Sequence, residues 1–120
     1  MNKDLLLRAR NPQGPVDIPI LGENGEWITA TVTVRGLTRQ EHLTSGYLAG
    51  EKPDAERLLT AESYVLAHGM VEPALTLEEA TEWRSTAPGI VVGPVLDMIR
   101  TLSASGPDAA KEIYKSLRSG

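Results

Sequence analysis

The chain has 120 residues, a mass of 13.0 kDa and a formal net charge of -4, and it contains no cysteine. This length suits a single domain over residues 1–120, and the lack of Cys excludes disulfides, thiolate metal sites and a cysteine nucleophile. No run approaches the ~18 apolar residues of a membrane span, so we expect a cytoplasmic protein with no membrane partner.

Acidic residues crowd the middle of the chain. Between Glu51 and Glu82 there are eight acids and only two bases, Lys52 and Arg57. Such a stretch repels phosphates, and no basic stripe or aromatic stacking platform is evident elsewhere. Direct binding of nucleic acid is therefore not expected. A solvated helix face is the favoured interpretation of the acids, and steering of a basic partner is the alternative.

Two alternating stretches predict a β-hairpin near the N-terminus. Residues 16–20 and 28–34 alternate apolar and polar side chains, and the second stretch is almost entirely β-branched. Between them lies Asn24-Gly25, a dipeptide that readily takes positive φ at both central positions of a tight turn. Pro19 donates no ladder hydrogen bond, which predicts that the first strand lies at an edge or is short.

Capping signals predict helices along the rest of the chain. Thr38 and Glu41 form the sequence of a capping box, and the helix they open should end at Gly46 or Gly50. Residues 46–53 have a loop-like composition. From Asp54 the spacing of Leu58, Ala61 and Val65 predicts a longer helix with Gly69 as its C-terminal cap.

The stretch 68–83 predicts a firm corner between two helices. Residues 71–75 should be extended because Pro73 disfavours helix at the residue before it. Thr76 and Glu79 then form a second capping box. Residues 90–102 carry helical apolar spacing, with Pro94 tolerated if the helix starts within one turn of it. A last amphipathic segment over 107–118 has Ile113, Tyr114 and Leu117 along its apolar edge.

We therefore expect an α+β fold that is mostly α. It consists of an N-terminal β-hairpin at about 16–35, then a compact bundle of four to five helices, with a helical core over 38–103 and a C-terminal helix over 107–118.

Few residues suggest chemistry. His42 and His68 have no second histidine at helical ligand spacing, so surface and capping roles are favoured over a metal site. Glu78, Glu79 and Glu82 share one short helix, which admits a carboxylate-based hydrolase or metal enzyme as the weakest alternative. No nucleophile elbow, dinucleotide fingerprint or phosphate loop is present. We expect no catalysis, no cofactor and no metal.

The residues expected to bind a partner are apolar. Each of the two tryptophans, Trp27 and Trp83, suits an interface anchor, although filling the domain's own core is at least as favoured in a chain with so few aromatics. The candidate partner-binding residues are Trp83, Met98, Ile113, Tyr114 and Leu117. Self-association into a homo-oligomer through an exposed apolar edge is also expected.

The order of these features resembles one known family. The segments "VTVRGLTRQE", "AESYVLAHGMVEPALTLEEATEW" and "VVGPVLDMIRTLS" appear in the order found in tail assembly chaperones of long-tailed, siphovirus-like bacteriophages. The positions that carry the resemblance are Arg35 to Glu41, Gly69 to Ala80 and Ile99 to Ser103, and the likeness covers residues 16–106. The chain departs from the family at 103–106, where Ser-Ala-Ser-Gly stands in place of a compact Ser-Gly.

The resemblance implies a non-catalytic protein of the host cytoplasm that is missing from the mature virion. Members of the family coat the tape measure protein and deliver it to tail tube subunits, and many exist in a short and a frameshifted longer form. The alternative within the same setting is a structural head-tail connector or tail-terminator protein that stays in the virion.

Overall fold

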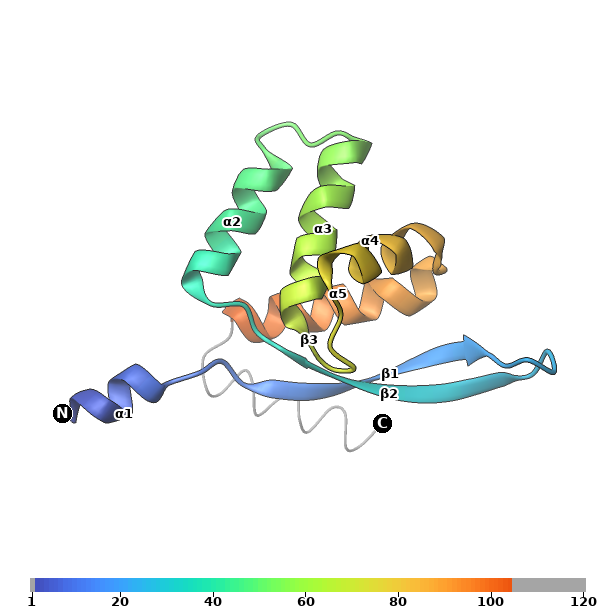
Figure 1. Cartoon of the computed structure of the whole chain (residues 1–120), viewed down its shortest axis with the longest axis horizontal. Helices are drawn as coiled ribbons and strands as arrows, with labels where there is room; N and C mark the ends of the chain where they lie inside the picture. Colours follow the sequence, from blue (N-terminus) through green and yellow to red (C-terminus); the bar gives the residue numbers. More distant parts are fainter. Residues whose placement is uncertain (1, 105–120) are drawn as a thin grey trace.

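The computed structural model describes residues 2–104 of the chain (Figure 1). In chain order the elements are α1 (Lys3–Arg8), β1 (Gln13–Leu21), β2 (Trp27–Arg35), α2 (Arg39–Ala49), α3 (Ala55–Gly69), β3 (Met70–Glu72), α4 (Leu77–Thr86) and α5 (Gly89–Ala104). The α+β class and the N-terminal hairpin are confirmed, although the short helix α1 before the hairpin was not anticipated. The helix expected over 107–118 lies outside the described residues.

The hairpin is longer than predicted and turns differently. Its strands pair in register from Gln13 with Arg35 to Leu21 with Trp27. Gly25 takes a φ of 81°, whereas Asn24 does not have positive φ, so the expected tight turn with two such residues is wrong. Instead the Gly22 N–H donates to the Glu26 carbonyl at 2.7 Å, which closes a wider loop.

One face of the sheet is buried and the other is solvated. Val16, Ile18, Val32 and Val34 are buried on the core face. On the opposite face the Thr31 hydroxyl donates to the Asp17 carboxylate at 2.6 Å. This division follows the two-residue period of the side chains that the sequence displayed.

A third strand, β3, was missed. Residues 70–72 pair with the end of β2 through Val34 with Met70 and Thr33 with Glu72, and the register shifts between them. The strand order is β1-β2-β3, so β1 lies at an edge as Pro19 predicted. Three residues are too few to display alternation, and their partners lie far away in the sequence. The extended backbone at 71–75 was predictable, but its pairing was not.

The two predicted capping boxes are both confirmed. The Thr38 and Thr76 side chains accept from the amides of Glu41 and Glu79, and each glutamate reaches back to the capping amide. Asp54 caps α3. Helix α2 ends at Ala49 with Gly50 as its C-cap at a φ of 75°, which confirms the later of the two predicted ends, so residues 46–49 are helical despite their loop-like composition.

Two positions were assigned the wrong role in the long helices. Gly69 is the last residue of α3 and has no positive φ, so it is not a left-handed cap. A Cβ at this position would lie 2.5 Å from Cδ1 of Ile99, which shows that α5 packs directly on its backbone. Pro94 is the sixth residue of α5 rather than within its first turn. The Pro94 ring is exposed to solvent at this position.

A compact bundle of helices is not confirmed. Helix α5 packs on β1 and β2, α3 and α4 pack on each other, and α2 packs on α3. Figure 1 shows α2 and α3 standing away from the sheet and α1 projecting at the N-terminal end. The single core lies between the sheet and α3, α4 and α5.

The end of β2 is the junction that connects these layers. The Arg35 guanidinium forms two 2.9 Å hydrogen bonds with the Glu41 carboxylate, and Nδ1 of His68 lies 2.9 Å from the same carboxylate. The Leu37 amide donates to the Ser103 hydroxyl at 2.7 Å, which ties α5 to the same place. The hydrogen bonds from Arg35 lower the pKa of Glu41 to about 2, although partial burial opposes the shift.

Candidate interaction surface

The far end of the hairpin carries a set of exposed apolar side chains that we call the hairpin end surface. Its members and their exposed fractions are Ile20 39%, Leu21 56%, Trp27 59% and Ile28 54%. They sum to roughly 400 Å² of apolar surface when a large side chain offers about 150–250 Å². The strand register divides this area between the two faces of the hairpin, so each face carries roughly 200 Å².

The strand register divides these four residues between two faces. Ile20 pairs with Ile28, and Leu21 pairs with Trp27. Directly paired residues point to the same face, so Ile20 and Ile28 continue the core face that Ile18 begins. Leu21 and Trp27 lie on the opposite face. Both faces of the hairpin are therefore apolar at its end.

The surface is exposed because the strands extend beyond the helices. Each strand has nine residues, which corresponds to about 30 Å. The core cluster includes Ile18 and Ala30, but no residue closer to the turn. Figure 1 shows the end of the hairpin projecting past α4 and α5. Ile20 and Ile28 thus form a piece of core face that the rest of residues 2–104 covers only in part.

The free edge of β1 is unsuited to adding another strand. The Gly22 amide bonds to Glu26 and the Gly36 amide bonds to the Pro12 carbonyl. In an antiparallel pair these bonds alternate, so the odd-numbered residues of β1 direct their backbone groups outward. Pro15 and Pro19 occupy two of these outward positions and have no N–H to offer. A partner would have to bind side chains here, not backbone.

The two predicted partner-binding residues that the structure describes do not belong to the hairpin end surface. Trp83 on α4 and Met98 on α5 are partly buried and pack against the core. Ile113, Tyr114 and Leu117 lie outside the described residues. Trp27 was weighed as an anchor, but Ile20, Leu21 and Ile28 were missed. The signal was present in the sequence: the adjacent pairs Ile20-Leu21 and Trp27-Ile28 break the alternation and make both faces apolar.

The acids proposed for the enzymatic alternative are exposed on α4. Glu79 is engaged in the capping box of Thr76, while Glu78 and Glu82 face solvent. No group of three His, Asp or Glu side chains among residues 2–104 is arranged to hold a metal ion. The geometry offers no assembled set of catalytic groups on this helix.

Within the described part of the chain, no helix combines the length and apolar character required to cross a bilayer. No protein-family model, no curated protein and no solved structure matches this chain.

Proposed function

We propose that this protein is a phage tail assembly chaperone that acts without catalysis in the host cytoplasm. It binds the tape measure protein, keeps it soluble and delivers it to the tail tube protein, and it is absent from the finished virion. The observation that carries the proposal is the hairpin end surface, because it is apolar, projecting and uncovered. A tape measure protein is a long helix whose apolar stripes need temporary cover, and docking such a stripe on exposed side chains meets that need.

The residues behind the resemblance also support the proposal by their position. Arg35 and Glu41 form an ion pair, Leu37 bonds to Ser103, and Gly69 packs against Ile99. Residues from all three blocks of the resemblance thus meet at one junction. They hold the fold together and do not form a binding site. A shared framework of this kind leaves the exposed surfaces free to suit different partners.

The weak-contact character of the surface fits transient binding. Each face of the hairpin end surface offers roughly 200 Å², about a quarter of the ~800 Å² that each partner buries in a standard stable interface. A single contact of this size dissociates readily. Many copies bound along one tape measure helix keep that helix covered through avidity. They still dissociate from it when the tail tube subunits polymerise.

The experiment is co-expression with the tape measure protein from the same genome, followed by measurement of its soluble fraction and of co-purification. The native chain should solubilise the tape measure protein, and the double variant Trp27→Ser/Ile28→Ser should lose that effect. Leu77→Ser, at a similarly exposed leucine on α4, is the matched control and should behave like the native chain. The proposal fails if the tape measure protein is equally soluble with the native and double-variant chains.

Mass spectrometry of purified virions separates the proposal from the connector or tail-terminator alternative. A chaperone should be missing from the particle. Recovery of the protein at a fixed copy number per tail would instead identify a structural component.

A further inference from the structure

Helix α2 has an outer face with no partner among residues 2–104. None of its 11 residues is buried, and its main packing neighbour is α3. Arg39, Leu43 and Tyr47 follow one another at four-residue spacing, which places them on one side of the helix. Leu43 is 54% exposed and Tyr47 84%. These three residues, which we call the α2 face, form an open, shallow surface of the helix together with Gln40 and Thr44.

The two ends of this face have opposite charge. At the N-terminal end, Arg39 lines a hollow of about 770 Å³ together with Arg10 and Arg35. Arg35 is neutralised by Glu41, whereas Arg39 has no ion pair among the described residues. The net character of this end is basic.

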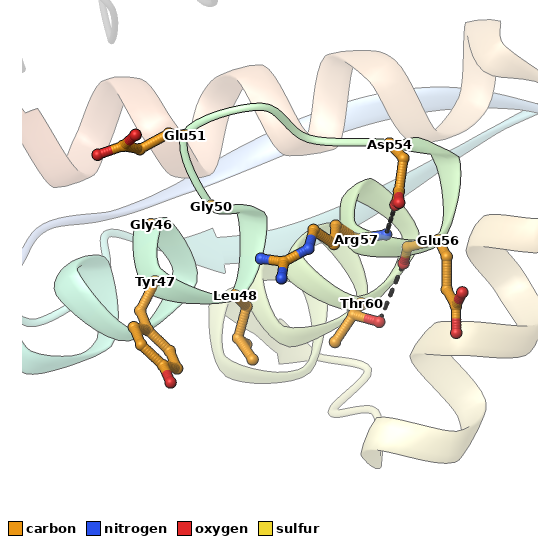
Figure 2. A pocket seen from close by; sticks show the side chains of 9 residues that line it. All are labelled: Gly46, Tyr47, Leu48, Gly50, Glu51, Asp54, Glu56, Arg57 and Thr60. Carbon is orange, nitrogen blue, oxygen red and sulfur yellow. Dashed lines mark hydrogen bonds between the residues drawn. The ribbon is translucent and has the colours of Figure 1, made fainter.

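At the C-terminal end, a hollow of about 810 Å³ between α2 and α3 contains Glu51, Asp54 and Glu56 against one base, Arg57 (Figure 2). Figure 2 shows Tyr47 projecting from the end of α2 and Arg57 reaching toward Gly50. Asp54 is engaged as the cap of α3, but Glu51 has no ion pair within residues 2–104. This end is acidic.

We propose that the α2 face binds the α2 face of a second copy, with the two helices antiparallel about a two-fold axis near Leu43. In this arrangement each Leu43 meets the Leu43 of the other copy. Arg39 and Tyr47 lie about 12 Å apart along a helix, so each tyrosine ring meets the other copy's Arg39 guanidinium in a cation–π contact. The acidic end of each copy meets the basic end of the other.

The charge pattern selects this partner and this orientation. A two-fold interface requires a surface that is complementary to itself, and a face with one basic and one acidic end satisfies the requirement only when antiparallel. Parallel helices would place arginine against arginine and glutamate against glutamate. One helix face and its two ends form a small interface, so the dimer is weak and concentration-dependent. It leaves the hairpin end surface free and does not depend on the proposed tape measure partner.

Sedimentation equilibrium of the full chain at increasing concentration tests the proposal. The native mass should rise from 13.0 kDa toward twice that value. Leu43→Asp and Arg39→Glu should each weaken the dimer at least tenfold, as should Glu51→Lys. Combining Arg39→Tyr with Tyr47→Arg should keep the native dissociation constant, because the antiparallel arrangement again brings each arginine to a tyrosine of the other copy. Leu77→Asp is the control and should leave dimerisation unchanged.

Circular dichroism checks that each variant is folded. All of the substituted positions are exposed, so the variants should retain native helicity. A native chain that stays monomeric at every concentration overturns the proposal. So does a dimer that survives Leu43→Asp, or one that is abolished by Trp27→Ser/Ile28→Ser instead. Loss of dimerisation in the double exchange Arg39→Tyr/Tyr47→Arg overturns the antiparallel arrangement.

Discussion

The contact between Gly69 and Ile99 predicts that one added methyl group destabilises the fold. Gly69 is helical without positive φ, so Gly69→Ala by itself should gain about 1 kcal/mol from helix propensity. The new Cβ, however, would lie 2.5, 2.8 and 2.8 Å from three side-chain carbons of Ile99. Carbon atoms pack at about 3.5–4.0 Å, so Ile99 would have to retreat by about 1 Å.

Ile99 has no room to retreat, because its exposed fraction is 0% and it lies inside the core cluster. Rotation about its χ angles does not help, since three of its carbons approach the same point. Overpacking of this kind costs typically about 1–3 kcal/mol, and the severity of the clash places this case at or above the upper end. After the propensity gain is subtracted, we expect Gly69→Ala to destabilise by about 2 kcal/mol.

The assay is urea denaturation at low micromolar concentration, with a double-mutant cycle. Ile99→Ala removes all three clashing carbons, so Gly69→Ala should be neutral or stabilising in that background and the coupling energy should reach about 2–3 kcal/mol. Gly46→Ala is the matched control: it is also a helical glycine, and a Cβ there meets nothing within 4 Å. It should stabilise by about 1 kcal/mol. A Gly69→Ala effect equal to that of Gly46→Ala would refute the reasoning.

Two further predictions concern the junction and α4. Glu41→Gln keeps the capping geometry but removes the charge that Arg35 stabilises. The folded pKa of Glu41, about 2, lies below the ordinary 4.5, so the carboxylate stabilises the fold above pH 4.5 and loses this effect as pH falls toward 2. The shift of the Glu41 pKa sets an upper bound near 3 kcal/mol on this stabilisation, and screening by solvent reduces it. The unfolding free energies of the native protein and Glu41→Gln should therefore differ by about 1–2 kcal/mol at pH 7 and converge near pH 2. A difference independent of pH would contradict the ion pair. Thr76→Ala removes the cap of α4 and should lower the free energy of unfolding, measured by urea denaturation, by about 1 kcal/mol. Thr81→Ala is the control: the Thr81 hydroxyl donates only to the Leu77 carbonyl, so its loss should change the free energy of unfolding by less than about 0.5 kcal/mol. Equal effects would show that the cap contributes nothing.

The surface positions illustrate how local patterns can mislead about exposure. Trp83 was weighed both as an interface anchor and as a core residue and is partly buried against the core, whereas Trp27, weighed in the same way, is exposed on the hairpin. Both are single tryptophans in amphipathic segments, and their sequence contexts do not distinguish them. The difference depends on how far α4 and α5 reach along the sheet, which is a property of helix packing.

The sequence alone determined the features that neighbouring residues settle among themselves. The capping boxes at Thr38 and Thr76 and the hairpin strands depend on residues at most a few positions apart or on a strict two-residue alternation. At the capping boxes, side chains adjacent in the chain satisfy the free backbone amides, and in the strands the alternation of side chains sets which face is buried.

Only the tertiary structure decided the features that join distant segments. β3 exists because residues 70–72 find the amides and carbonyls of β2, 36 positions away for Met70 and Val34. Position 69 has no room for a side chain, because Ile99 occupies the space that its Cβ would fill. The hairpin end and the α2 face are exposed because no helix of the described residues 2–104 covers them. Burial and close approach depend on where the whole chain places its elements, and no window of adjacent residues contains that information.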